Sequence, residues 1–469
     1  MTENPTDPHV HDLLEFLRFP SVSTQSNHAS DLVACANWLR TKFVKIGLEA
    51  SVLETGGHPA VLARTPHDPS KRTVLIYGHY DVQPPEPLDE WKSPPFEPEI
   101  RDGRIFARGS TDNKGQILAH ILGLGEILAR GEIPPVNVTF LVEGEEETGS
   151  ANLEAFLESH REELACDVIV ISDTGMAAHG FPTLTYALRG IAALEFKLTG
   201  PSQDLHSGVF GGAITNPATA LARLIATLHD ADGRVAVPGF YDLVQPLADW
   251  EREAAAALPI TEEQLRQLTG VRALAGEPGY SAVERLGARP TVEVNGLGGG
   301  YQGEGTKTVL PREAFAKLTM RLVPAQDPAT VLQQVSDHLR DHCPDTVDLH
   351  LTAGHCGEAY FMDPNQPDGL AARRALEKVF GRSPALMREG GSIPIVTTFK
   401  KVLGADSLLL ALASPDCCAH SPNENFPLEN FHAGIRLHQA VLEELGREGR
   451  GEGAATDRAK TERPGFQNR

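Results

Sequence analysis

Residues 136–150 read VNVTFLVEGEEETGS, a largely apolar run that passes directly into four glutamates within five positions. A short run of this kind is typical of a strand that is buried on both faces. Glu143, Glu145, Glu146 and Glu147 would repel one another there, because nearby like charges in a low-dielectric site raise carboxylate pKa values and reduce stability. The stretch therefore predicts a buried sheet and requires a positive partner for its glutamates.

Similar apolar runs lie on both sides of this stretch and alternate with helical patterns. TVLIYG (73–78) comes before the amphipathic GQILAHILGLGEILARG (115–131), and NLEAFLESHREEL (152–164) leads into DVIVIS (167–172). Continuous apolar strands that alternate with helices indicate a mainly parallel sheet covered by helices on both faces. We therefore predict an α/β fold with a mainly parallel central sheet.

The pattern changes near Leu188. The segments 192–200, 314–324 and 345–354 alternate like half-exposed strands, and helical patterns lie between them. This arrangement predicts a smaller α+β domain with an antiparallel sheet. The α/β pattern resumes after about residue 366. We expect a first domain in residues 1–188 that is completed by 357–446, an inserted domain in 189–356, and a disordered tail in 447–469.

Charge and cysteine content narrow the class of protein. The 469 residues include 63 acidic and 42 basic side chains, for a formal charge of -21, which disfavours nucleic acid and anionic membranes as partners. Six scattered cysteines without a CxxC pair are typical of reduced cytosolic thiols. The N-terminus lacks signal-peptide features, and no run of apolar residues is long enough to span a membrane. We expect a cytoplasmic protein.

Ligand-type side chains follow three of the predicted strands. His79 and Asp81 come directly after the first apolar run, the glutamates follow the second, and Asp173 follows the third. In an open parallel sheet such strand ends meet at one edge, where ligands bind. Asp112, just before a helix, and His420, after the apolar run 407–413, complete the set. Imidazole with carboxylate suits zinc, manganese or cobalt, so the sequence predicts a metal site at this edge.

Each of these residues also has a simpler interpretation. Asp112 could cap the following helix, and Asp173 could be a turn residue. The glutamates could form a solvated helix N-terminus. The metal site is favoured because one edge of one sheet would gather all of these groups. The glycine-rich NGLGGGYQGEG (295–305) has no following helix and no phosphate-binding lysine, so we predict a loop there.

Seven motifs occur in an order and at spacings that resemble one known family. They are HYDVQP (79–84), GSTDNKG (109–115), EGEEETGS (143–150), DLHSGVFGG (204–212), KTVLPREAFAKLTMRLVP (307–324), REGGSIP (388–394) and AHSPNE (419–424). From about residue 10 to 445 the chain resembles the dinuclear-metal peptidases, which include carnosine dipeptidases, aminoacylases, carboxypeptidase G and succinyl-diaminopimelate desuccinylase. DLHSGVFGG and REGGSIP are most similar to the cytosolic nonspecific dipeptidase branch.

The resemblance implies two divalent metal ions per subunit, zinc or manganese, with cobalt as a third candidate. His79 and Asp173 would hold one ion, and Glu147 and His420 the other. Asp112 would bridge the two ions. Such a cation pair would supply the positive partner that the glutamate-rich stretch requires.

The same resemblance assigns work to neighbouring residues. Asp81 would orient His79, and Glu146 would be the general base. The Asp112–Asn113 peptide is usually cis in this family. By strand alternation one of Glu143 and Glu145 should face away from the cations, and we expect Glu145 to accept hydrogen bonds or contact solvent instead of binding metal.

Four further residues are implied in the inserted lid domain and near the substrate. His206 resembles the histidine that reaches the active site of the partner subunit and stabilises the tetrahedral intermediate. Thr308 and Arg321 resemble substrate-binding residues of the lid, with the guanidinium suited to a C-terminal carboxylate. Ser392, in a Gly-Gly-Ser sequence, would line the same pocket.

The implied protein is a metal-dependent hydrolase that cleaves dipeptides or short unblocked peptides with a two-metal-activated water. It would act as a homodimer formed through the lid. The alternative is an N-acyl-amino-acid amidohydrolase of the deacylase or desuccinylase type, since Arg321 is compatible with either substrate. A non-catalytic metal-binding or peptide-binding protein is disfavoured, because both Glu146 and His206 are present.

Overall fold

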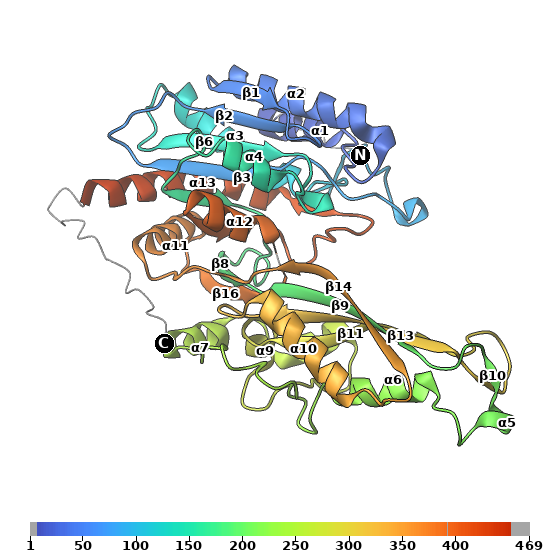
Figure 1. Ribbon diagram of the computed structural model, residues 1–469. Helices are drawn as coiled ribbons and strands as arrows, with labels where there is room; N and C mark the ends of the chain where they lie inside the picture. The colour runs from blue at the N-terminus through green and yellow to red at the C-terminus, as the bar shows by residue number, and fades with distance from the viewer. Residues whose placement is uncertain (1–6, 392, 452–469) are drawn as a thin grey trace.

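The computed structural model describes residues 7–391 and 393–451 (Figure 1). A nine-stranded sheet with its helices forms the upper part of the molecule in Figure 1, and a separate four-stranded sheet with its own helices lies below it. No helix among the described residues is long and apolar enough to cross a membrane.

The large sheet is parallel at its centre. Its strands lie in the order β1-β2-β6-β3-β7-β17-β8-β15, with β16 beside β8. The strands are β1 (Glu49–Leu53), β2 (Ala60–Arg64), β3 (Thr73–His79), β6 (Asn137–Glu143), β7 (Val168–Ile171), β8 (Thr183–Leu188), β15 (Tyr360–Phe361), β16 (Ala385–Glu389) and β17 (Asp406–Leu410). Strands β6, β3, β7 and β17 run parallel, whereas β1, β2, β8 and β15 add antiparallel pairs on either side. The predicted α/β fold is confirmed, and its parallel pairing is concentrated in the middle of the sheet.

Helices bury both faces of this sheet, and every residue of β6 and β7 is buried. The helices are α1 (Pro8–Leu17), α2 (Ala29–Lys45), α3 (Lys114–Ala129), α4 (Leu153–Ser159), α11 (Pro367–Phe380), α12 (Pro394–Leu403) and α13 (Leu428–Gly451). Helix α13 packs closely against α3, since a Cβ on Gly123 would lie 2.6 Å from the Ile435 carbonyl oxygen. Glycine at position 123 therefore permits this contact between the two helices.

Helix α13 corrects the predicted start of the C-terminal tail. It continues to Gly451, so residues 447–451 are helical and not a disordered tail. The reason is a set of ion pairs, because Arg447 contacts Glu443 and Glu444, while Arg374 of α11 contacts Glu448. These pairs support a segment that lacks large apolar residues. The rest of the predicted tail, 452–469, lies outside the described residues.

The second sheet is antiparallel, in the order β11-β13-β9-β14. Its strands are β9 (Gly190–Thr199), β11 (Thr291–Gly299), β13 (Glu313–Leu322) and β14 (Asp348–Gly357). Helices α6 (Pro217–Ala226) and α10 (Pro328–His342) cover one face, where Phe196 and Leu318 contribute to a second hydrophobic core. Alternating burial along β13 leaves the other face partly exposed. The predicted inserted domain, residues 189–356, contains this sheet except for Gly357 and is called the lid below.

The predicted loop 295–305 is partly wrong, because β11 extends to Gly299. The glycines fit the strand for a packing reason. A Cβ on Gly298 would lie 2.5 Å from Phe315 Cε1, so only glycine lets this ring cross the neighbouring strand.

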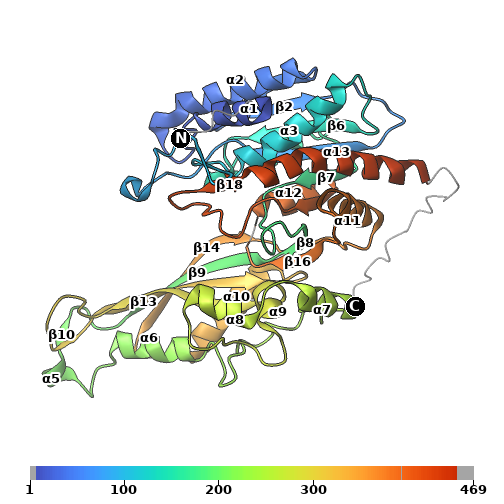
Figure 2. The same cartoon turned by 180° about the vertical axis from the view of Figure 1, so that it is seen from behind.

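Shorter elements complete the chain. In the lid they are β10 (Leu205–His206), α5 (Ser207–Phe210), α7 (Asp249–Ala257), α8 (Glu262–Thr269), α9 (Ala282–Ala288) and β12 (Val309–Leu310). Strands β4 (Glu99–Arg101), β5 (Arg104–Phe106) and β18 (Asn425–Pro427) form a small sheet beside the large one. Both views place β10 and α5 at the outer end of the lid, away from the large sheet (Figures 1 and 2). We call β10, α5 and β12 the lid tip.

Candidate metal centre

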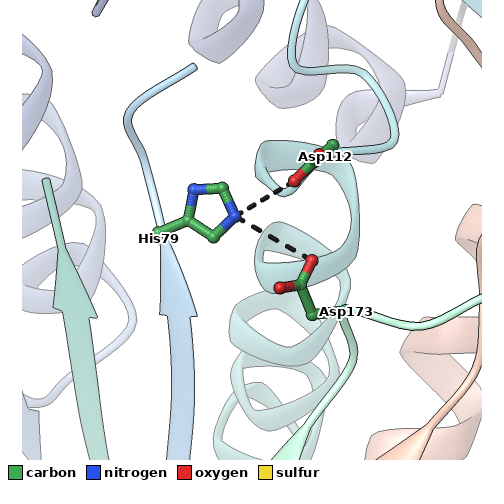
Figure 3. Close-up of side chains that lie close together, drawn as sticks. All are labelled: His79, Asp112 and Asp173. Carbon is green, nitrogen blue, oxygen red and sulfur yellow. Dashed lines mark ion pairs between the residues drawn. The ribbon is translucent and has the colours of Figure 1, made fainter. Parts of the chain in front are cut away.

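His79 ends β3 with its side chain fully enclosed. The Nδ1 atom lies 3.1 Å from the Asp81 carbonyl oxygen and 3.3 Å from Asp81 Oδ1. On the other side of the ring, Nε2 points between two carboxylates, 3.1 Å from Asp112 Oδ1 and 3.9 Å from Asp173 Oδ1 (Figure 3). This buried nitrogen has no hydrogen-bond partner in the part of the chain that the structure describes. Such an atom, aimed between two acids, has the arrangement of a metal ligand.

The two acids come from different loops of the chain. Asp112 lies in the loop before α3, and the predicted cis peptide between Asp112 and Asn113 is confirmed. Asp173 follows β7, and its Oδ1 accepts a 2.9 Å hydrogen bond from Asn113 Nδ2. The same amide nitrogen donates to the Ser172 carbonyl oxygen at 2.6 Å. Asn113 therefore fixes the loop that carries Asp112 to the end of β7.

A second group shares Asp112. His420 Nε2 lies 2.9 Å from Asp112 Oδ2 and 3.4 Å from Glu147 Oε2. Glu147 sits in the single turn Glu146–Thr148 that follows β6, and its Oε2 accepts from Gln83 Nε2 at 2.7 Å. His420 adopts a φ of 59°, a left-handed conformation that costs a residue with a side chain about 1 kcal/mol. Strained backbone conformations of this kind are common at functional sites, which is consistent with a role for this loop in positioning the imidazole.

The residues form two adjoining sets with the geometry of a two-ion site. His79, Asp112 and Asp173 can place one ligand atom each within 4.8 Å of one another, and so can Asp112, Glu147 and His420. Asp112 contributes Oδ1 to the first set and Oδ2 to the second. Imidazole nitrogens with carboxylate oxygens fit zinc, manganese or cobalt. The residues therefore fit a pair of divalent ions bridged by one carboxylate.

Asp81 and Glu146 lie beside these sets without belonging to either. Asp81 is fully buried, and besides contacting His79 it accepts backbone hydrogen bonds from Glu146 at 3.3 Å and from Glu147 at 3.0 Å. It therefore orients both the imidazole and the turn that carries the two glutamates. Glu146 is close enough to Asp173 and Asp112 for their charges to raise its pKa, but it joins neither ligand set.

The electrostatics of the cluster reflect an excess of acid. Burial, followed by the charge of Asp112, raises the pKa of Glu147 to about 8. Burial also raises the pKa of Glu146 well above its ordinary value. The hydrogen bond to Asp112 raises the pKa of His420 to about 9. These shifts have one cause, because carboxylates crowded in a desolvated site favour bound protons, and divalent cations would favour the ionised forms.

The remaining two glutamates of the motif face elsewhere. Glu145 accepts hydrogen bonds from Asn152 Nδ2 at 3.0 and 3.1 Å, which confirms that it bonds to protein groups. Glu143 accepts a hydrogen bond from the Tyr77 hydroxyl and another from Ser150 Oγ at 2.9 Å. Neither belongs to a ligand set among the described residues.

Glu424 is a site residue that the ligand pattern alone did not identify. It is completely buried and accepts backbone hydrogen bonds from Gly109, Thr111 and Asp112 at 2.9 to 3.0 Å. It also accepts from Arg108 Nη1 at 2.7 Å. The sequence does contain a signal for Glu424, because this residue is the last of the AHSPNE motif, four positions after His420. Glu424 thus ties the loop of one ligand to the loop of another.

Glu389 is a second residue that was missed, although it stands in the REGGSIP motif. It ends β16, and its buried Oε2 has no hydrogen-bond partner in the described chain. Burial, followed by the charge of Asp173, raises the pKa of Glu389 to about 7. An unpartnered carboxylate oxygen beside the ligand sets is available to a bound molecule.

The lid residues do not join the metal cluster. His206 and Thr308 lie together at the lid tip, where the Ser207 backbone N–H donates to the Thr308 carbonyl oxygen at 3.0 Å and β10 pairs with β12. The His206 side chain is exposed, and its Nδ1 accepts from the Gly208 N–H at 3.0 Å. Within this chain the lid tip lies away from β3 (Figures 1 and 2).

Arg321 occupies a different part of the lid. It lies on β13 opposite Ile191 of β9 and Thr291 of β11, and it lines a cavity together with Arg189. Ser392 lies outside the described residues, so its predicted place in the same pocket stays a prediction.

Comparison with known proteins agrees with this geometry. Residues 75–444 match the model of peptidase family M20/M25/M40. The chain belongs to peptidase family M20/M25/M40. This M20 peptidase is 33% identical to the Cys-Gly metallodipeptidase dug1 of Schizosaccharomyces pombe, over 94% of the chain and 96% of that protein. It is 34% identical to the human Beta-Ala-His dipeptidase, over 82% of the chain and 77% of that protein.

The fold of the M20 peptidase is also that of its relatives. An M20 family metallo-carboxypeptidase from Sulfolobus solfataricus superposes with a TM-score of 0.82 at 34% identity, covering 94% of this chain and all of the other, 100%. Family membership identifies the chain as a metallopeptidase, and the two curated relatives named above are dipeptidases by name.

Proposed function

We propose that this chain hydrolyses dipeptides and short unblocked peptides with two divalent ions per subunit, zinc or manganese, with cobalt as a third candidate. His79 and Asp173 would hold one ion, Glu147 and His420 the other, and Asp112 both. The single observation that supports this assignment is the pair of ligand sets that share Asp112 through its two oxygens. When bound, the ions would acidify a water molecule between them and polarise the scissile carbonyl.

Glu146 is the proposed general base. Its carboxylate is buried beside both ligand sets but belongs to neither, so it stays free to titrate. It would take the proton of the attacking water and pass that proton to the leaving amine. Asp81 would support this step through its hydrogen bonds to the backbone of Glu146 and Glu147.

A free peptide carries a positive amine and a negative carboxylate, and we propose one binding residue for each. Arg321 suits the C-terminal carboxylate, and the unpartnered oxygen of Glu389 suits a free α-amino group. Ser392 is proposed to contact the substrate in the same region. A blocked N-terminus would leave Glu389 buried without a partner, which favours unblocked peptides over N-acylated amino acids.

We propose further that two copies associate through the lid, with residues 189–356 as the lid and dimerisation domain. His206 and Thr308 would then reach the metal centre of the partner, where the imidazole would donate a hydrogen bond to the developing oxyanion. Apolar side chains are exposed on several lid elements, namely Val209, Phe210, Leu297 and Phe315. Such exposed groups are typical of an association surface.

A reducing compartment, the cytoplasm, is proposed because all six cysteines are free thiols.

A substrate panel tests the proposed function. The metal-free protein is loaded separately with Zn²⁺, Mn²⁺ or Co²⁺ and assayed on Ala-Gly, Cys-Gly, β-Ala-His, N-acetyl-alanine and succinyl-diaminopimelate. We expect hydrolysis of unblocked dipeptides and little turnover of the two acylated compounds. Turnover of the acylated compounds alone would instead support the amidohydrolase alternative. No turnover of any compound with any ion would refute the proposed activity.

A further inference from the structure

A cavity of about 470 Å³ lies in the lid, next to the segment that connects the lid to the metal centre. Its walls come from the start of β11, the end of β13, helix α9 and the chain between β9 and β11. The volume falls in the range of ligand pockets. Of the residues that were given a role in the proposed peptidase function, Arg321 is the one that lines this cavity.

The cavity borders the catalytic edge through a short chain of contacts. Arg189, in its wall, donates from Nε to the Gly390 carbonyl oxygen at 3.1 Å and from its backbone N–H to the Glu389 carbonyl oxygen at 3.3 Å. Glu389 in turn is close enough for the charge of Asp173 to raise its pKa. A peptide with its amine at Glu389 and its carboxylate at Arg321 would therefore have its C-terminal residue at the mouth of the cavity.

The polar wall of the cavity is positively charged. Four arginines line it, whereas Glu277 and Glu293 are its acidic residues. Glu277 is already engaged, with hydrogen bonds from Arg289 at 2.6 and 2.9 Å and an ion pair with Arg234 at 3.2 Å. The four arginines are Arg189, Arg285, Arg289 and Arg321.

Burial and the neighbouring positive charge lower the pKa of one arginine in the wall. Burial, followed by the charge of Arg321, lowers the pKa of Arg189 to about 10. Among the described residues, the ion pair of Arg285 is a loose one, 3.9 Å from Glu262. Because Glu277 balances the charge of Arg289, three arginines of the wall remain against Glu293. In a chain with a formal charge of -21, this cavity is a local attractor for anions.

The rest of the wall is apolar. Val235, Leu274, Leu286 and Pro290 provide hydrocarbon surface beside the arginines. A ligand that complements both surfaces has a short hydrocarbon stem and a negative head. The side chains of glutamate and aspartate have this composition, and a carboxylate pairs well with a guanidinium fork.

We propose that this cavity receives the side chain of the substrate's C-terminal residue and favours an acidic side chain over its neutral isostere and over a basic one. The proposal rests on the proposed peptidase function and adds a substrate preference to it. Arg285 would be the residue that contributes charge selectivity, because it lines the cavity without carrying the backbone carboxylate of the substrate.

The test compares kcat/KM for Ala-Glu, Ala-Gln and Ala-Lys, with Ala-Gly as the reference dipeptide. We expect the wild-type enzyme to prefer Ala-Glu over Ala-Gln by about 10-fold and Ala-Gln over Ala-Lys by a similar factor. Arg285→Gln should bring the Ala-Glu to Ala-Gln ratio close to unity, and Arg285→Lys should restore most of it. Arg340→Gln, on the exposed face of α10, is the matched control and should keep the wild-type ratio.

The outcomes separate this proposal from the function on which it rests. If Ala-Gly and all other dipeptides resist hydrolysis, the peptidase function fails. If Ala-Gly is cleaved but the wild-type enzyme does not discriminate among Glu, Gln and Lys, the charge-selective subsite is wrong. If the preference exists but Arg285→Gln, with an unchanged thermal melting temperature, retains it, the preference arises elsewhere and the cavity is excluded as its source.

Discussion

The metal edge of the large sheet and the lid tip carry residues of the same kind but hold them in opposite ways. At the metal edge, His79 is fully buried, contacts Asp81 on one side and faces two carboxylates on the other. At the lid tip, His206 is exposed, and its described ring contact is with the nearby Gly208 N–H. The first histidine is surrounded by groups of its own chain that could share a metal ion with it, whereas the second faces outward from the lid tip.

The difference explains what each region requires. A charged cluster in a low-dielectric site needs fixed partners, so the metal edge is held by buried hydrogen bonds from several parts of the chain. A group that acts on another molecule must remain accessible until that molecule arrives. The contrast supports a divided active site, in which one copy supplies the metal ligands and the other supplies His206.

The largest effect is expected within the metal edge itself. Glu146→Gln should lower kcat by about 1,000-fold, because the substituted amide cannot accept the proton of the attacking water. Metal affinity, measured by titration calorimetry, should stay near the wild-type value, since Glu146 belongs to neither ligand set. Glu145→Gln is the matched control, because Glu145 bonds to Asn152 and should affect kcat only slightly. Near-normal kcat for Glu146→Gln would remove this residue as the base.

The second prediction tests whether the two regions meet across subunits. His206→Ala and Glu146→Ala should each be nearly inactive alone. Unfolded together and refolded as a mixture, they should recover about a quarter of wild-type turnover, because random pairing forms mixed dimers with one intact composite site. Absence of recovery, with mixed dimers demonstrated by mass spectrometry, would show that His206 does not act on the partner.

A smaller effect is expected from the residue that ties two ligand loops together. Glu424→Gln places amide hydrogens against backbone N–H groups that now donate to a carboxylate, so the Asp112 loop should loosen. Metal affinity should fall by about 10 to 100-fold, as it does when residues that orient metal ligands are replaced. Calorimetry with Mn²⁺ checks this result without an activity assay. The exposed neighbour Glu429→Gln should leave affinity unchanged, and equal affinities for both variants would contradict the role of Glu424.

The smallest effect concerns stability in acid. His120 is buried between Ser172 and His438, and burial lowers its pKa from 6.5 to about 4. Because the unfolded chain takes up the proton first, stability is complete above pH 6.5 and is lost as the pH falls toward about 4. At about pH 5 this one group should reduce the free energy of unfolding by about 2 kcal/mol relative to neutral pH.

Urea unfolding of the metal-free protein measures this difference. His120→Gln should lose less stability between neutral pH and about pH 5 than wild type does, by about the same 2 kcal/mol. An identical pH dependence for wild type and His120→Gln would show that His120 titrates normally.

The central strands were predictable because each is a continuous apolar run. The run 136–142 became β6, and 167–172 contains β7, since burial on both faces leaves one interpretation of such segments. The ligand sets followed from the same reasoning, because strand ends of a parallel sheet meet at one edge. His79 and the glutamate cluster were therefore identifiable before their geometry was known, whereas the separate roles of Glu146 and Glu147 were implied by the family resemblance.

Other features depend on contacts between residues that are far apart in the sequence, and a local sequence pattern does not reveal such contacts. The antiparallel strands β1 and β2 have five residues each, and β1 is partly exposed, so their sequence pattern is weak. The strand ending in Gly299 was predicted as a loop, because its glycines make room for Phe315 of another strand. Glu424 looks like a surface acid in sequence, and only its four donors from residues 108–112 show that it is a structural anchor.

The position of β17 has a consequence for how the enzyme is made. This strand lies between β7 and β8 in the sheet, yet it follows the whole lid in the chain. A ribosome releases the chain N-terminal end first, so β7 emerges long before its neighbour and presents an unpaired apolar edge in the meantime. A message truncated before residue 406 would therefore yield a fragment whose β7 edge stays unpaired, and such an edge makes a fragment prone to aggregate.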